Sequence, residues 1–160
     1  MISSFSPLES AAWGGFLSAY ARLDRAIDAD LLAHDGIRHV EFEVLLRLWS
    51  EPGHRLRMQD LAARSLLTRS GVSRAVERLQ RAGLVRREEA REDRRGAWAV
   101  LTDAGATRFR AAARAHVPLV RRVFLDLFTP DELQALAAGW QRVEQHLEQA
   151  QAERAGPDRD

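Results

Sequence analysis

The sequence of 160 residues contains no cysteine, no lysine and no long uninterrupted apolar run. The absence of cysteine excludes disulfides, thiolate metal sites and sensing by thiol oxidation. No stretch reaches the ~18 apolar residues that a membrane helix needs. The first residues, MISSFSPLES, also lack the basic start and apolar core of a secretory signal. We therefore expect a cytoplasmic protein without a membrane partner.

Motifs of the common enzyme classes are also missing. The sequence has no Gly-rich phosphate loop, no nucleophile elbow and no pair of carboxylates placed for acid–base chemistry. None of the histidines forms an i, i+4 pair on a predicted helix, although His34 and His39 lie near one loop. We predict that the protein is not an enzyme and that it holds neither a metal nor a cofactor.

Arginine is abundant, and it is concentrated in the middle of the chain. Residues 54–102 contain 12 arginines and 6 acidic residues, which gives this segment a net charge of +6. The rest of the chain contains 12 arginines and 17 acidic residues, so the overall charge is only +1. A basic segment between acidic flanks indicates a localised surface that binds a polyanion.

Helix signals occur along most of the chain. Ser6, Pro7 and Glu9 combine a capping box with a proline at the first helical position, and Gly36 suits the exit from the same helix. We therefore predict a first helix up to about residue 35 and a second over 39–50. Thr102 is predicted to open a further long helix that Pro118 should kink or interrupt, and Thr129 the last one.

Between these helices, residues 58–101 follow the order of a helix-turn-helix and a β-hairpin. We predict helices over 58–64 and from Thr68 to Gly83, then strands over 84–89 and 97–101. The second strand alternates, so that Ala97, Ala99 and Leu101 face the core while Trp98 and Val100 face outward. An outward tryptophan has no evident partner in this pattern.

The two motifs resemble those of the MarR family of bacterial transcription regulators. The likeness is carried by RLRMQDLAARSLLTRSGVSRAVERLQRAGLVRR and by DRRGAWAVLTDAG, which holds the family's Asp-x-Arg wing motif and the strand that ends in Leu-Thr. The resemblance implies one mainly α-helical domain over 1–160. It comprises a winged helix-turn-helix with a small β-hairpin wing over 38–102, flanked by long dimerisation helices over 6–35 and 103–152.

The resemblance also implies a homodimer in which the first, fifth and sixth helices of each subunit interlock. Such a dimer would cover the apolar stripes of these helices, which one small winged helix could not bury. An intramolecular helical bundle is the alternative.

The likeness and the charge together predict that the winged helix binds double-stranded DNA. The expected contacts are Arg69, Ser70, Ser73, Arg74, Arg78, Arg86, Asp93, Arg94 and Arg95. Arg74 is the candidate for bidentate readout of guanine, whereas Arg78 would touch the backbone. By likeness to the family, Asp93 braces the wing loop and Arg95 lies in or beside the minor groove. A solvated basic helix face is the alternative interpretation.

A small aromatic or phenolic effector is a further implication of the resemblance. Its pocket would lie between the dimerisation helices and the winged helix, with Trp13, Phe16, Tyr20, His39 and Phe42 as candidate walls. The same aromatic stripe also fits a core or a dimer interface.

The sequence thus predicts a ligand-responsive repressor that reads a pseudo-palindrome with half-sites about 10 base pairs apart. The alternative function is a helical dimeric protein-interaction adaptor without specific DNA binding.

Overall fold

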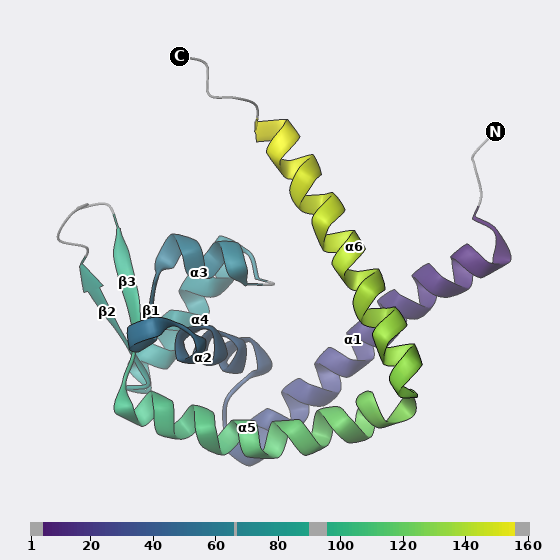
Figure 1. Ribbon diagram of the computed structural model, residues 1–160. Coiled ribbons are helices and arrows are strands. Elements are labelled where there is room, and N and C mark those ends of the chain that lie inside the picture. Colours follow the sequence, from purple (N-terminus) through teal and green to yellow (C-terminus); the bar gives the residue numbers. More distant parts are fainter. Residues whose placement is uncertain (1–4, 66, 90–95, 156–160) are drawn as a thin grey trace. The chain divides into compact units, whose positions relative to one another are not determined.

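A computed structural model of the protein describes residues 5–65, 67–89 and 96–155, which form α-helices and one antiparallel sheet (Figure 1). In chain order the elements are α1 (Pro7–Asp35), α2 (His39–Ser50), a 3-10 turn η1 (Pro52–His54), β1 (Arg55–Arg57), α3 (Met58–Arg64), α4 (Arg69–Arg81), β2 (Val85–Glu89), β3 (Ala97–Leu101), α5 (Asp103–Val123), a 3-10 turn η2 (Leu125–Leu127) and α6 (Pro130–Ala155). The mainly α fold with a small wing is confirmed. The chain divides into two compact units, Met1–Leu119 and Val120–Asp160.

The helix ends that the sequence predicts are confirmed by hydrogen bonds. At the start of α1, Glu9 N donates to Ser6 Oγ at 3.2 Å, and Ser6 N donates to Glu9 Oε2 at 2.7 Å. Gly36 ends that helix with a φ of 63°, a left-handed conformation that glycine adopts without strain. Thr129 caps α6 through a reciprocal pair of hydrogen bonds with Glu132.

The hydrophobic core of the first unit lies between α2, α4, the sheet and the first half of α5. α2 and α4 present one apolar stripe each, and β3 covers them with Ala99 and Leu101. Phe109 and Ala112 close the core from α5. The fully buried large side chains are Leu31, Leu45, Leu48, Leu61, Leu79, Val44, Val72, Val76 and Val85.

The sheet has three strands in the order β1-β3-β2, whereas the sequence predicted only the hairpin of β2 and β3. In β1, Arg55 lies opposite Val100 and Arg57 opposite Trp98. The three residues of β1 are too few to carry a strand pattern of their own, and pairing with β3 makes them extended. Strand β1, which the sequence did not predict, therefore brings Arg55 and Arg57 to the wing.

The start of α5 is joined to the turn that follows α4. The hydroxyl of Thr102 accepts from Gly105 N at 3.0 Å and lies 2.8 Å from the carbonyl oxygen of Gly83. Gly105 is buried, and a Cβ atom there would lie 2.0 Å from the carbonyl oxygen of Leu84. Only glycine allows this close approach of the two backbones.

The sequence predicted that Pro118 would kink or interrupt α5, but the helix continues through it to Val123. Both Pro118 and Arg114, whose carbonyl loses its helical partner, are exposed. Water can therefore solvate the carbonyl group. In the second unit, α6 buries none of its described side chains. Among the described helices, none is both long and apolar enough to cross a membrane.

Candidate nucleic-acid interface

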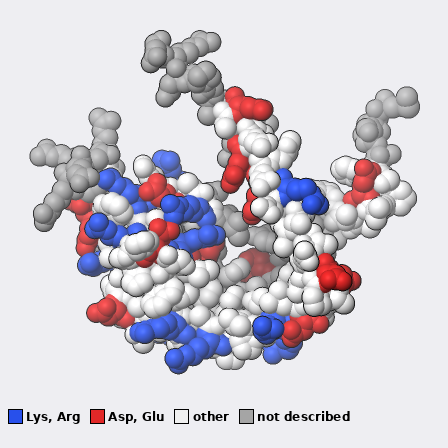
Figure 2. Space-filling view, viewed as in Figure 1, with Lys and Arg blue, Asp and Glu red and all other residues white. Residues whose placement is uncertain are grey.

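Helix α4 presents two chemically distinct faces, as its sequence predicts. Thr68 caps the helix by accepting a hydrogen bond from Gly71 N at 3.1 Å. Its inner face is buried, while Arg69, Ser70 and Arg74 are exposed near its N-terminus. Figure 2 shows arginine side chains gathered over the winged-helix part of the chain. The outer face therefore offers charged and hydroxyl donors suited to phosphates and base edges.

A polar hollow of about 320 Å³ opens beside this face. It lies between the first turns of α4, the end of β1 and the start of β3. Arg69 and Ser73 line it from α4, Arg57 from β1 and Arg87 from β2. The other described lining residues are Met58, Gln59, Gly96 and Ala97, so none is acidic. Three arginines thus converge on one depression beside the predicted DNA-reading helix.

Arg87 links the wing to α4. Its Nη2 donates to Ser73 Oγ at 3.2 Å and lies 3.9 Å from Glu77 Oε1. The Nε of Arg87 is buried and has no hydrogen-bond partner within the described residues. Ser73, predicted as a DNA contact, is half-buried because of this link. Its position is therefore set by the wing as well as by the helix.

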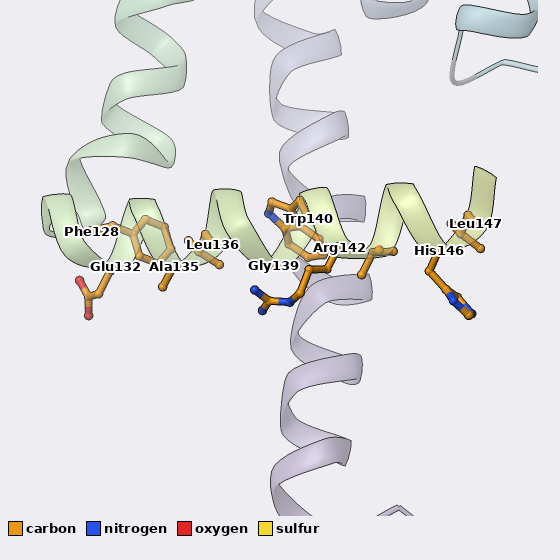
Figure 3. A pocket seen from close by; sticks show the side chains of 10 residues that line it. Phe128, Glu132, Ala135, Leu136, Gly139, Trp140, Arg142, His146 and Leu147 are labelled. Carbon is orange, nitrogen blue, oxygen red and sulfur yellow. The ribbon is translucent and has the colours of Figure 1, made fainter. Parts of the chain in front are cut away.

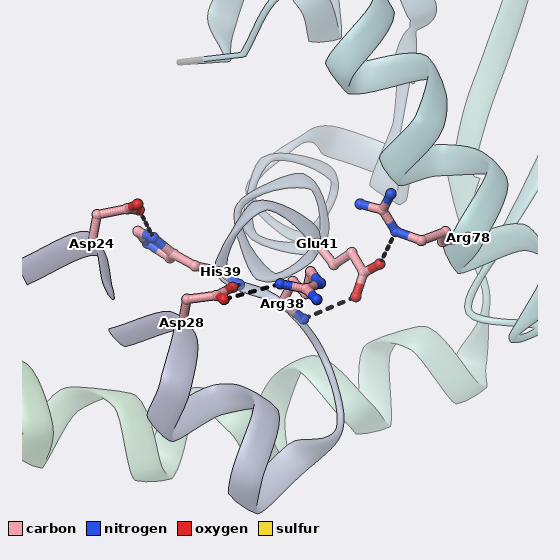
Figure 4. Close-up of polar contacts among 6 residues, drawn as sticks. All are labelled: Asp24, Asp28, Arg38, His39, Glu41 and Arg78. Atoms are coloured by element: carbon pink, nitrogen blue, oxygen red, sulfur yellow. Dashed lines mark hydrogen bonds and ion pairs between the residues drawn. The ribbon is translucent and has the colours of Figure 1, made fainter. Parts of the chain in front are cut away.

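Arg78 lies in a different environment from the other predicted contacts. Its Nε donates to Oε1 of Glu41, a buried carboxylate on α2 that is 8% exposed (Figure 4). The other oxygen of Glu41 accepts from Arg38 N at 2.9 Å and so caps α2. Arg78 thus ties α4 to α2. Its predicted contact with the DNA backbone stays a prediction.

The wing itself is described only in part. Arg86 is exposed on β2 and forms an ion pair with Glu88 at 2.8 Å. Asp93, Arg94 and Arg95 lie outside the described residues, so their predicted roles at the wing tip stay predictions.

Trp98, which the sequence left without a partner, contacts two arginines of β1 through its ring. The guanidinium carbons of Arg55 and Arg57 lie 4.6 and 4.9 Å from its ring centroid. These distances are within the range of cation–π attraction. Sequence reasoning missed both arginines because they belong to a strand, β1, that it did not predict.

The predicted effector residues fall into two groups. Trp13, Phe16 and Tyr20 are exposed along one face of α1, with ring centroids 5.8 and 6.4 Å apart. His39 and Phe42 are on α2, where Phe42 is buried against Phe109 at 5.5 Å. The role of all five as pocket walls stays a prediction.

His39 belongs to a charged environment. Its Nδ1 is 2.8 Å from Asp24 Oδ1, and its backbone N donates to Asp28 Oδ1 at 2.9 Å (Figure 4). A hollow of about 410 Å³ beside it is lined by Asp24, Arg25, Asp28, Ala29, Leu32, Arg38, His39 and Val40.

The ring of His116 on α5 stacks with that of His39, with the ring centroids 6.4 Å apart. Burial lowers the pKa of His116, and the charge of His39 adds to this effect, while Asp30 opposes it. No group of three or more potential metal ligands occurs within residues 5–65, 67–89 and 96–155.

Comparison with known proteins gives matches to transcription regulators. A sequence profile of the MarR family matches residues 35–96. The uncharacterized HTH-type transcriptional regulator YfiV of Bacillus subtilis (strain 168) is 31% identical over 99 residues, which is 61% of each chain. PrsX of Escherichia coli is 31% identical over 77 residues, or 48% of this chain and 46% of PrsX. The chain thus spans about half to three-fifths of the length of these curated relatives.

Solved structures match over a larger share of the chain. AbsC, a MarR family transcriptional regulator from Streptomyces coelicolor, is 35% identical with a TM-score of 0.84, and the match covers 91% of this chain and 98% of AbsC. Sco3205, a MarR family transcriptional regulator from the same organism whose structure is in complex with DNA, is 35% identical with a TM-score of 0.86 over 92% of each chain. Sequence and fold agree over nearly the whole length, and the chain belongs to the MarR family of transcription regulators.

Proposed function

We propose that the protein is a transcription regulator that binds double-stranded DNA through α4 and the wing. The observation that carries this proposal is the exposed basic face of α4 beside a hollow lined by three arginines. The complex of the similar protein Sco3205 with DNA supports it. In this arrangement α4 enters the major groove, where Arg74 contacts a base edge and Arg69 a phosphate.

Binding to the DNA upstream of its own gene tests the proposal. We expect Arg74→Ala to weaken specific binding about 5- to 150-fold, the equivalent of about 1–3 kcal/mol for one bidentate base contact. Arg121→Ala is the control, because Arg121 is an exposed arginine on α5 outside the candidate interface. Equal affinities of the two variants, measured by fluorescence anisotropy, would contradict the role of Arg74.

The protein acts as a homodimer in this proposal, so that two copies of α4 read two half-sites about 10 base pairs apart. The support is the group of exposed apolar side chains on α1 and on α6. Exposed apolar residues are normally scattered singly, whereas groups of them mark interaction surfaces. On α6, an open depression of about 820 Å³ is bordered by Leu136, Trp140, Val143 and Leu147 (Figure 3). Trp140 is 41% exposed, and Val143 and Leu147 are about half exposed.

Light scattering tests the dimer. We expect the wild type to have twice the mass of one chain and Trp140→Asp to shift the population toward the monomer, because the charge would be buried at the interface. Gln134→Asp is the control, because Gln134 is an exposed residue on the same helix as Trp140. A monomeric wild type would refute the homodimer.

The regulator is a repressor that a small aromatic or phenolic effector releases, according to this proposal. The exposed rings of α1 and the hollow near His39 are surfaces that such a ligand could contact. Phenolic acids should then weaken the DNA complex and quench tryptophan fluorescence. The competing adaptor function predicts no mobility shift even at low salt, and the charge of +6 over residues 54–102 disfavours it.

A further inference from the structure

Arg87 of β2 is joined to α4 by a short chain of hydrogen bonds. Alternate residues of a strand share one side, and Val85, two positions earlier, is buried in the core, so Arg87 is directed inward as well. Its Nη2 donates to the carbonyl oxygen of Ser73 at 3.4 Å and to Ser73 Oγ at 3.2 Å. Ser73 Oγ donates in turn to Oε1 of Glu77, one helical turn further along α4, at 3.4 Å. The Arg87–Ser73–Glu77 bridge thus connects the wing with the candidate DNA-reading helix.

The chemistry of the two outer groups fixes the direction of each hydrogen bond in this bridge. A guanidinium can only donate, and a carboxylate can only accept. The single hydroxyl proton of Ser73 is therefore directed to Glu77, and one of its two lone pairs accepts from Arg87. Ser73 can offer DNA only its second lone pair. Ser70 differs, because its hydroxyl partner is Thr68 Oγ1 at 3.2 Å and either oxygen can be the donor.

The surroundings of the bridge hold the hydroxyl in this orientation. Ser73 is half-buried, and the Nε of Arg87 is buried without a hydrogen-bond partner within the described residues. An enclosed guanidinium of this kind has little freedom to move away from the serine. Glu77 Oε1 also lies 3.9 Å from Arg87 Nη2, so the opposite charges attract each other across the hydroxyl group. Rotation of the hydroxyl would remove the hydrogen bond to the carboxylate.

Ser73 lines the polar hollow beside the outer face of α4, where a base edge would lie. In the major groove, adenine N6 and cytosine N4 are amino groups that donate, whereas guanine O6 and thymine O4 accept. A serine that can only accept is satisfied by an amino group. The carboxylate of Glu77 beside it repels the electronegative edge of guanine or thymine. The hydrogen-bond pattern therefore distinguishes two classes of base on the strand that Ser73 faces.

We propose that Ser73 is a specificity-determining residue that selects a base with an exocyclic amino group, adenine or cytosine, and that Arg87 and Glu77 are positioning residues that fix the direction of its hydroxyl proton. The proposal rests on the proposed DNA-binding function and assigns a class of base to one position of the site that α4 reads. Through Arg87, the wing thereby affects which base the helix accepts without touching that base.

Selection from a DNA library tests this proposal. The full chain is allowed to bind a duplex randomised over about 25 base pairs, which spans two half-sites, and the base preference at each position is measured. We expect a position at which the wild type prefers adenine or cytosine. Ser73→Ala should reduce this preference about 2- to 12-fold, the equivalent of one neutral hydrogen bond. Ser73→Thr keeps the hydroxyl group and should retain the preference.

Variants of the two positioning residues separate orientation from charge. The amide of Glu77→Gln can donate to Ser73 Oγ, which releases the serine proton, so guanine or thymine should become acceptable at the same position. Glu144→Gln is the matched control, because Glu144 is exposed on α6 and the change in charge is equal. Arg87→Lys keeps the charge but not the planar fork. It should lose the base preference while the slope of log K against log salt, about 0.9 per phosphate contact, keeps its wild-type value.

Base analogues report on the amino group itself. The selected adenine is replaced by purine, or the selected cytosine by pyrimidin-2-one, each of which lacks only the amino group. This replacement should weaken binding of the wild type by the same factor as Ser73→Ala, and it should leave the affinity of Ser73→Ala unchanged. Urea unfolding of each variant reports any loss of stability separately.

Each outcome decides the proposal. Loss of one shared base preference in Ser73→Ala and Arg87→Lys, with a broadened preference in Glu77→Gln, supports it. The proposal is wrong, while the proposed function stands, if Ser73→Ala keeps every preference of the wild type or if the base affected is guanine or thymine. The same holds if Glu77→Gln and Arg87→Lys only weaken binding equally for all sequences. If the wild type binds no duplex even at low salt, both are wrong.

Discussion

The ion pair between Arg78 and Glu41 gives the sharpest test of how α4 is held. Removing one partner of a buried pair costs about 3–5 kcal/mol. The side chain of Arg78 is 39% exposed while that of Glu41 is only 10% exposed, so water screens part of this interaction. We expect Arg78→Met to lower the free energy of unfolding by about 2 kcal/mol, because the carboxylate of Glu41 stays buried.

Glu41→Gln should cost less, about 1 kcal/mol, since the amide oxygen can still accept from Arg38 N and cap α2. The double variant should lose about 1–2 kcal/mol less than the sum of the single variants. Urea unfolding at one fixed protomer concentration measures these differences, because the proposed dimerisation would make stability depend on concentration.

A different result would refute this reasoning. If Arg78→Met left the unfolding free energy unchanged but lowered the salt slope of DNA binding, Arg78 would be a backbone contact, as its place on the polar face of α4 predicts. The two measurements together distinguish a residue that holds the helix from one that touches DNA.

Two further predictions concern packing and protonation. Gly105→Ala should destabilise the fold by about 3 kcal/mol or more, because its Cβ would lie 2.0 Å from Leu84 O. Gly15→Ala is the control, because Gly15 faces open space on α1 and the change should stabilise the helix by about 0.5–1 kcal/mol. Thermal unfolding compares the two variants, and equal melting temperatures would contradict the close approach at Gly105. The pKa of His116 is lowered in the folded state from its ordinary 6.5, so the unfolded chain binds more protons below that pH and stability falls as the pH decreases through that window. His116→Phe should keep the ring contact with Phe42 and reduce this acid-side loss in urea titrations between pH 7 and about 5.5; an unchanged pH profile would show that His116 does not cause it.

Local signals in the sequence were enough to predict the helices and the hairpin. The Ser6 and Thr129 caps depend on residues three positions apart, so they can be recognised without knowledge of the fold. The alternation along β3 likewise predicted that Ala99 and Leu101 face the core. The same alternation predicted that Val100 faces outward, but Val100 is buried with only 5% of its surface exposed.

Features that depend on distant parts of the chain were not predictable in this way. Arg78 was assigned to the DNA face by helical periodicity, but its partner Glu41 lies 37 positions earlier on α2. β1 becomes a strand through pairing with β3, and without β1 the surroundings of Trp98 could not be inferred. Such contacts follow from tertiary packing, which a local pattern does not encode.

The contacts of Thr102 and Gly105 also restrict how the protein can move. They join the first turn of α5 to the turn after α4 through short hydrogen bonds and a backbone contact that leaves no room for a side chain. A rotation of α4 by even a small angle would therefore carry the beginning of α5 with it. In mechanical terms, α5 is a lever fixed at one end to the candidate DNA-reading helix.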